Sequence, residues 1–512
     1  MGDCGREERI RFIDKPINFR PILFCALSFA VGIFFFRFFA KEKFRAALYA
    51  AATLLVVFLI ALPFCIKSRK KIYFVMSAVC LVFCFSGFLF GDAAMKNYVE
   101  SKVERGDYLV VGEVDRVSGY NGKYFYTLKN CTYNGECGGN LNIRYCNRKF
   151  EKYDKIRLSC SVVDKSEYDG NGISPYVMYD NPMVTTRIVY IEKIGESSSL
   201  KAGFLRFTDE ILSNMGKDEA AVGKALICGD TSDMGEKIDV FRLSGIAHVF
   251  AVSGMHVGLV FAAFSLLLKF IPLRKYIKSI LIGAALFFYA YLCGMTASSV
   301  RAATMCFFMA LTGSFGEKKD RVNSLALAII VVLALNPFDL FTKGFILSFA
   351  VSFGLIVLIN PLNDLFSFTV KKLRDSLVVL VSAEAVSIPL SVMLFGYFPI
   401  VSVVTNLFFV PLVSLVFFML WFGLLLCMIM PVNRLIALYI PNLLLKFLTS
   451  CSETLSKFPL QITNFPFAAV ILYFAAILIV SDIVNVDKVV KRISGAFAFS
   501  IIIIAMIFSF AA

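Results

Sequence analysis

Apolar runs of about 20 residues recur along most of this chain, and each is long enough to cross a hydrocarbon core of about 30 Å as one helix. Lipid offers no hydrogen-bond partners to the backbone, so a run that spans must be helical. Of the 512 residues, 58% are hydrophobic and 17% are charged, against roughly 45–50% and 25% in soluble domains. An ordinary water-soluble enzyme is excluded. We predict a polytopic α-helical membrane protein.

The candidate spans form two blocks, which together predict about 11 to 13 spans or re-entrant elements. The first block has runs at 21–40, 46–66 and 72–94, and the second at 246–271, 276–293, 297–313, 322–335, 344–361, 377–395, 400–430, 465–481 and 495–512. The run at 400–430 has 31 residues, which at about 1.5 Å per residue is too long for one upright span. We therefore predict a broken pair or re-entrant element there, interrupted at Pro411.

The basic charge lies mainly in the membrane part. The formal net charge is +15, but residues 96–200 carry 15 basic and 14 acidic side chains. Basic clusters at 274–278, 318–321, 371–374 and 488–492 mark alternate loops. Because cytoplasmic loops are enriched in Lys and Arg, we predict a cytoplasmic N-terminus and an extracytoplasmic segment at 96–200. The first run lacks a small-residue cleavage site, so it is predicted to be a retained span.

The polar segment at 96–200 has the pattern of a small β domain. Strand-like runs at 108–117, 123–128, 140–145 and 155–163 are separated by turn residues such as Asn121-Gly122. Short strands at this spacing predict a small barrel or sandwich. The predicted domains are thus an N-terminal three-span region at 1–95, the β domain at 96–200, amphipathic interfacial helices at 201–245 and a transmembrane domain at 246–512.

Four cysteines lie in the β segment: Cys131, Cys137, Cys146 and Cys160. Their spacing fits no zinc pattern. In an oxidising exterior, one or two disulfides are expected among them, with three pairings possible. The alternative is four reduced thiols in the β core.

Both histidines of the chain fall in one window, Gly245-Ile-Ala-His248-Val-Phe-Ala-Val-Ser253-Gly254-Met-His256. Two interpretations stand equally: histidines packed at a helix break, or a hydrated lining of a transport path. A metal site would need further ligands, and no metal or other cofactor is predicted. A Ser/His hydrolase lacks the G-x-S-x-G elbow.

Two charges lie deep in candidate spans, at Arg301 and Glu384. A mid-membrane Arg costs roughly 2.5–3.5 kcal/mol on insertion scales, so such a residue needs a partner or water. We expect both to face the bundle interior, although Arg301 could instead snorkel from a helix end. Polar breaks, including Asn406, recur nearby and are typical of spans that bend around a path.

Several motifs resemble the ComEC family of competence proteins. They are Ala225-Leu-Ile-Cys-Gly-Asp230, Phe241-Arg-Leu-Ser-Gly-Ile-Ala-His248 and Ala251-Val-Ser-Gly-Met-His256, followed in family order by segments at 294–302, 336–339, 344–349 and 395–399 with Asn406 and Pro411. The resemblance covers roughly residues 20–480. It implies an inner-membrane channel for single-stranded DNA uptake, with an extracytoplasmic OB-like domain.

The resemblance also implies partners and a path. A surface DNA receptor would deliver duplex, a cytosolic ATP-driven motor would pull, and a separate nuclease would act, because the metallo-β-lactamase-like domain of many members is absent; the chain itself is expected not to be an enzyme. His248, Ser253, Gly254, His256, Arg301, Glu384 and Asn406 would line the path. Tyr124, Phe125 and Tyr126 could stack bases. A secondary transporter of an anionic solute is the alternative, and an intramembrane hydrolase using Ser253 is a third.

Overall fold

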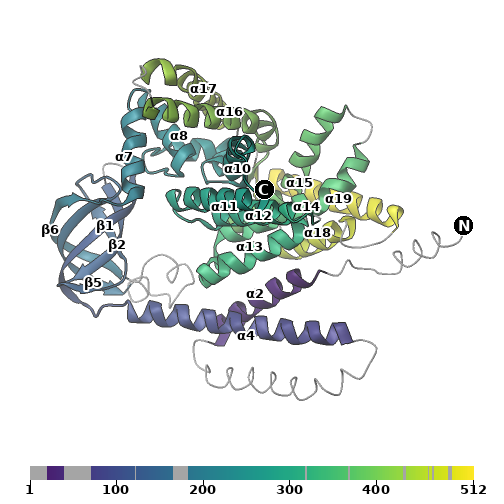
Figure 1. Cartoon of the computed structure of the whole chain (residues 1–512), viewed down its shortest axis with the longest axis horizontal. Coiled ribbons are helices and arrows are strands. Elements are labelled where there is room, and N and C mark those ends of the chain that lie inside the picture. Colours follow the sequence, from purple (N-terminus) through teal and green to yellow (C-terminus); the bar gives the residue numbers. More distant parts are fainter. Residues whose placement is uncertain are drawn as a thin grey trace, which may run out of the picture.

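The computed structural model of the chain is mostly helical, with one β-barrel, formed by the N-terminal part of the sequence, at the left of Figure 1. It describes residues 20–39, 71–120, 123–164, 183–317, 320–366, 370–429, 434–458, 461–463, 466–481 and 487–511. The predicted span at 46–66 lies outside these residues.

Five of the described helices are long and apolar enough to cross a membrane. They are α4 (Lys71–Glu100), α11 (Lys275–Leu292), α14 (Lys343–Leu365), α15 (Lys371–Phe395) and α16 (Ser402–Ile429). The shorter apolar helices are α2 (Pro21–Phe39), α10 (Gly254–Lys269), α13 (Arg321–Leu335) and α18 (Phe467–Val480). With α12 (Ala297–Ser314), α17 (Arg434–Leu455) and α19 (Lys488–Ala511) they complete the bundle. The prediction of a multi-pass helical membrane protein is confirmed.

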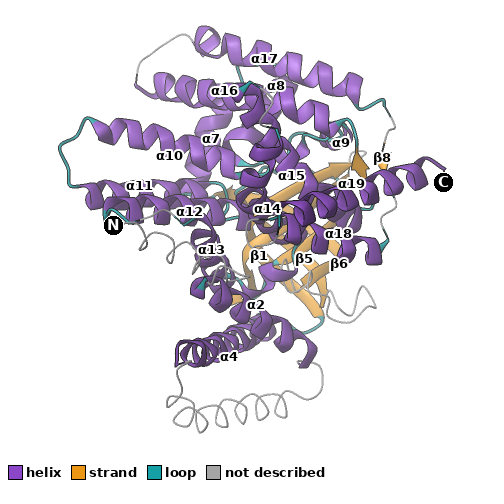
Figure 2. Cartoon of the chain, turned by 90° about the vertical axis from the view of Figure 1, so that its right-hand side faces the viewer, coloured by secondary structure: helices purple, strands orange, loops and turns teal. Residues whose placement is uncertain are grey.

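Helix α16 corrects one prediction. It runs without interruption for 28 residues, with Pro411 inside it. Proline removes one backbone donor, but neighbouring helices in a membrane bundle can accommodate that loss. The predicted break is therefore wrong. The additional helix is α17, which sequence analysis missed because Asn442 and Lys446 interrupt its apolar run; it lies beside α16 (Figure 2).

Helices α2 and α4 pack closely against each other at two glycines, Gly32 and Gly87. A Cβ at Gly32 would lie 1.9 Å from the carbonyl oxygen of Cys84, and one at Gly87 would lie 2.1 Å from that of Phe29. No side chain larger than hydrogen fits at either position. Small residues allow this close backbone approach in membrane helices, where van der Waals packing drives association.

The β domain is a closed barrel of five long strands. They are β1 (Gly106–Tyr120), β2 (Lys123–Tyr133), β4 (Leu141–Cys146), β5 (Asp154–Asp164) and β6 (Met183–Glu196), with a short β3 (Glu136–Cys137) hairpinned onto β2. The order is β1-β5-β6-β4-β2, and a β1–β2 pairing closes the ring. Among the described strands of the barrel, only β4 and β6 pair in parallel. This is the OB-like arrangement of a five-stranded Greek-key barrel.

Strand positions argue against the predicted disulfides. All four cysteines of the barrel are free. Cys131 on β2 and Cys160 on β5 are separated by β1, which pairs with both strands. Neighbouring strands lie about 4.8 Å apart, so two strand spacings exceed the Cα separation that a disulfide can bridge. Cys146 lies opposite Tyr124, far along β2 from Cys131, and Cys137 is exposed whereas Cys131 is buried.

Three helices join the barrel to the bundle: α7 (Leu200–Leu212), α8 (Lys217–Cys228) and α9 (Lys237–Leu243). Their apolar faces form one core with α16 and α17, which includes Phe241, Val413 and Leu445. A 3₁₀ turn, η1 (Ala247–Val249), leads from α9 into α10. A second, η2 (Pro337–Phe341), precedes α14, and the short strands β7 (Phe398–Pro399) and β8 (Gln461–Ile462) pair near the start of α16.

Candidate functional site

The histidine window forms the entry to α10. Helix α10 begins at Gly254, with Ser253 as its N-cap, and Ser253 and His256 form a capping box. The backbone N–H of Ser253 donates to Nδ1 of His256 at 3.3 Å. Since Nδ1 accepts, the neutral imidazole carries its proton on Nε2. That nitrogen is buried without a hydrogen-bond partner, and the ring packs on Phe417 with centroids 4.5 Å apart.

His248 has a different environment from His256. Its side chain is exposed on η1, and its Nδ1 lies 3.2 Å from the carbonyl oxygen of Gly245. Gly245 has φ +84°, and a Cβ there would lie 2.2 Å from that of Ser402. The hydroxyl of Thr405 donates to the carbonyl of Ser244 at 2.9 Å. The turn before His248 is therefore fixed against the first turn of α16.

Arg301 joins α12 to two other helices. Its Nη1 donates to the carbonyl oxygen of Ser348 and to the hydroxyl of Ser352, both on α14. Its guanidinium carbon lies 5.8 Å from the ring centroid of Phe349. A Cβ added at Gly254 would lie 3.3 Å from Nη2 of Arg301, so a glycine at the start of α10 leaves room for the guanidinium. The side chain faces the bundle interior, as predicted.

Glu384 is also buried and bridges two helices. Its Oε2 accepts from the hydroxyl of Ser387 at 2.7 Å, and its Oε1 accepts from the amide of Asn406 at 2.8 Å. Two residues that the sequence analysis selected separately thus contact each other across α15 and α16. Glu384 also lies within electrostatic reach of His248.

The structure places the predicted path residues in two adjoining groups. Ser253, Gly254 and His256 lie near Arg301, while Glu384 and Asn406 contact each other and form the second group. Neither ring nitrogen of His256 contacts the Ser253 hydroxyl, because one accepts from the backbone and the other packs on Phe417. This geometry gives no support to a Ser/His hydrolase. Within the described residues, no group of three or more His, Cys, Asp or Glu could hold a metal ion.

Sequence analysis missed the partners of Arg301. Ser348 and Ser352 lie four residues apart and so share one face of α14, a spacing that could have indicated a polar surface facing a cation. The contact of Gly245 with Ser402 has no comparable local signal, because 157 positions separate the two residues in the sequence.

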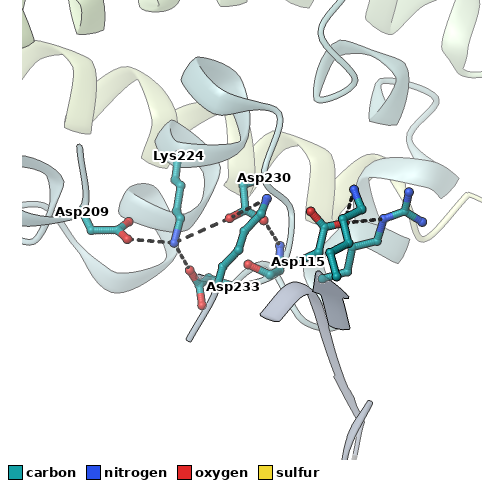
Figure 3. A network of polar contacts seen from close by, with 9 residues as sticks. Asp115, Asp209, Lys224, Asp230 and Asp233 are labelled. Carbon is teal, nitrogen blue, oxygen red and sulfur yellow. Dashed lines mark hydrogen bonds and ion pairs between the residues drawn. The ribbon is translucent and has the colours of Figure 1, made fainter. Parts of the chain in front are cut away.

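A network of ion pairs links the barrel to α8 (Figure 3). Nζ of Lys224 lies 3.0 Å from Asp209, 2.8 Å from Asp233 and 3.9 Å from Asp230. Lys152, from the barrel, lies 3.4 Å from Asp230. Burial lowers the pKa of Lys224, but the three carboxylates outweigh it and raise that pKa above its usual value.

A polar cavity of about 580 Å³ lies between the barrel and the helices. Its walls come from β1, β2 and β4, from the segment at 228–232 after α8, from α7, and from the turn at 292–296 before α12. Seven charged side chains line it: Asp115, Arg116, Lys129, Arg144, Lys152, Lys201 and Asp230.

The three predicted stacking aromatics differ in their surroundings. Phe125 lies on its wall and contacts Tyr145, with ring centroids 5.3 Å apart. Tyr126 is a core residue, 2% exposed, whose hydroxyl donates to the carbonyl of Arg148. Tyr124 packs on Tyr126 with centroids 6.3 Å apart. Of the three, Tyr126 is the one buried in the barrel core.

Comparison with known proteins identifies the family. The model of the competence protein family matches residues 226–483, which include the histidine window, Arg301, Glu384 and Asn406. The chain belongs to the competence protein family. The barrel lies outside the matched segment.

Two relatives give more limited matches. ComE operon protein 3 of Bacillus subtilis (strain 168) is 32% identical over 215 residues, 42% of this chain and 27% of the relative. An uncharacterized protein of Aquifex aeolicus (strain VF5) is 29% identical over 216 residues, 40% of this chain and 50% of the relative. The matched segments thus cover 27% of the length of the first relative and 50% of the length of the second. No solved structure matches the chain.

Proposed function

We propose that this chain is a channel of the cytoplasmic membrane that takes up single-stranded DNA during natural transformation. The observation that carries the proposal is the family match over residues 226–483, which contain both histidines, Arg301 and Glu384. The five long apolar helices and the barrel supply the membrane part and a domain of a type that binds single strands elsewhere.

The proposal assigns different roles to the path residues. His248 is exposed and Ser253 half-buried, so these two are proposed to contact the strand. His256, Arg301, Glu384 and Asn406, with Gly254, are proposed to position the helices that border the path, since their polar atoms bond to neighbouring helices or caps. The barrel is proposed to be extracytoplasmic and the N-terminus cytoplasmic, as the basic loops predict. A surface DNA receptor, a cytosolic ATP-driven motor and a separate nuclease complete the proposed pathway.

Transformation frequency tests the function. Deletion of the gene in its host is expected to abolish transformation by added DNA, and the intact gene is expected to restore it. His248→Ala is expected to lower the frequency, while His248→Gln, which keeps a polar contact, is expected to lower it less. If the host transforms normally without the gene, the chain is not the uptake channel.

A second function, secondary transport of an anionic solute, is favoured by one specific observation. The guanidinium of Arg301 is buried and its hydrogen-bond partners are neutral, so it could pair with a substrate anion. Solute-driven flux in proteoliposomes that Arg301→Gln abolishes, together with normal transformation in the deletion strain, would favour this function.

A further inference from the structure

Two cysteines from different helices lie close together on the wall of the cavity between the barrel and the helices, which we call the junction cavity. Cys228 is the last residue of α8, and Cys293 is the C-cap of α11. Both thiols are free and buried, and both residues line the cavity. The two positions are far apart in the sequence, so only the fold brings them together.

The end of α8 is held against the end of α11 by two contacts to one carbonyl group. The hydroxyl of Tyr289 donates to the carbonyl oxygen of Ile227 at 3.4 Å, and Sγ of Cys293 lies 3.7 Å from the same oxygen. That oxygen and Cα of Cys228 belong to one planar peptide unit, so Sγ of Cys293 lies within about 6.5 Å of this Cα. Because the Cα atoms of a disulfide lie about 4.4–6.8 Å apart, a side-chain rotation and a small shift of either helix end suffice to join the pair.

The junction cavity gives the Cys228 side chain room to turn toward Cys293. In the structure the Cys228 thiol contacts the hydroxyl of Thr208 on α7. The cavity has a volume of about 580 Å³, within the range of about 300–1,000 Å³ usual for ligand sites, so it also admits a small oxidant. On the orientation proposed above, this cavity lies on the extracytoplasmic side, where disulfides form and persist.

The surroundings of Cys228 favour a lasting bond over a rapidly reversible one. Burial, with the neighbouring Cys293 and Asp230, raises the pKa of the Cys228 thiol. A thiol with a high pKa has little thiolate at neutral pH and is a poor leaving group in thiol exchange. Oxidation is therefore slow, and the disulfide is reduced slowly once it has formed.

We propose that Cys228 and Cys293 are a disulfide site that links α8 covalently to α11. Formation breaks two S–H bonds and makes one S–S bond, and the two protons and two electrons pass to an oxidant of the disulfide or diazene class. The bond closes a loop over residues 229–292, which contains both histidines and α10. Helix α8 packs on α16 and α17, whereas α11 packs on α10 and α12, so the bond joins two packed parts of the molecule. The inference goes beyond the proposed function and uses none of its DNA chemistry.

Mass spectrometry of the purified full chain in detergent tests the site. The chain is oxidised with diamide, a diazene, and then denatured, its remaining thiols are blocked with N-ethylmaleimide, and it is digested with trypsin. The tryptic peptides 225–237 and 279–301 contain one cysteine each, Cys228 and Cys293, so a linked pair identifies the bond. We expect most of both peptides to be linked and to separate on reduction with dithiothreitol.

A variant and a matched control make the result specific. Cys293→Ser is expected to abolish the linked pair and to leave Cys228 blocked by N-ethylmaleimide. Cys451→Ser, half-buried on α17 and outside the cavity, is the control and is expected to form the linked pair as the wild type does. Oxidation is also expected to raise the melting temperature of the wild type by about 5 °C, because the bond constrains the unfolded chain, and to leave Cys293→Ser unchanged.

The outcomes separate this inference from the proposed function. Oxidised wild type in which Cys228 and Cys293 both remain blocked by N-ethylmaleimide overturns the proposal, and so does linkage of either residue only to other cysteines. A linked pair together with normal transformation in the deletion strain supports the disulfide site and overturns the channel function. No linked pair, together with loss of transformation in the deletion strain, overturns the disulfide site and supports the channel.

Discussion

Lys224 is a buried cation shared by three carboxylates, and its removal tests that arrangement at the scale of a residue. Asp230 is only 5% exposed, whereas Asp209 and Asp233 are 45% and 41% exposed and are screened by water. Lys224→Met leaves Asp230 with one remaining cation, Lys152. We expect the free energy of unfolding to fall by about 3 kcal/mol, as for a broken buried pair. Thermal unfolding in detergent, followed by circular dichroism, measures the change.

A second lysine provides the control for Lys224. Lys237 on α9 contacts Asp218 and Glu453, both half exposed, at 2.7 Å and 3.1 Å. Lys237→Met is expected to cost less than about 1 kcal/mol, because exposed pairs contribute little. Equal costs for the two variants would contradict the importance of burial at Lys224.

The turn between α9 and α10 is tested at the scale of an element by Gly245, with Gly235, which precedes α9, as the control. Gly245 has φ +84° and meets Ser402, while Gly235 has φ +53° with nothing within 4 Å of an added Cβ. Gly235→Ala is expected to cost about 1–2 kcal/mol from backbone conformation alone. Gly245→Ala adds a clash with the main chain of α16, so it is expected to lower the melting temperature further and to reduce transformation. Similar melting temperatures for both variants would mean that α16 moves aside freely.

Local patterns predicted elements well and their termini less well. The long apolar runs predicted α11, α14 and α15 closely, because helix formation in lipid depends on local hydrophobicity. The prediction of a break at Pro411 was wrong, because the residues around the proline, and not the proline itself, decide whether α16 continues. Strand β6 was missed, and its parallel pairing with β4, which precedes β5 in the chain, follows from no local pattern.

The candidate site was predicted in its residues but not in its contacts. The rarity of histidine and of buried charge selected His256, Arg301 and Glu384 from composition alone. The contact of Glu384 with Asn406 joins two helices and follows from no spacing rule. The junction cavity draws on residues from 115 to 296, so only the folded chain reveals its charge.

At the scale of the whole molecule, the barrel is attached to the helices partly by an ion pair. The pair of Lys152 and Asp230 crosses that junction, at 3.4 Å and with exposures of 19% and 5%. We expect a double-mutant cycle of Lys152→Met and Asp230→Asn to give a coupling of about 0.5–3 kcal/mol at pH 7, as for buried neighbours. The pair Arg242 and Asp239, within the exposed surface of α9, is the control and is expected to give less than about 0.5 kcal/mol.

The coupling at the junction is also expected to depend on pH. Desolvation raises the pKa of Asp230, but Lys152 and Lys224 outweigh it and hold that pKa below its ordinary value. A carboxylate with a lowered pKa in the folded state stabilises the fold above its unfolded pKa, and the contribution is lost as pH falls through the folded value. The ordinary value for Asp is about 3.9, so thermal unfolding should keep the full coupling near neutrality and lose it progressively below about pH 4. A coupling that stays constant down to pH 2 would mean that the Asp230 carboxylate does not hold the barrel to the bundle.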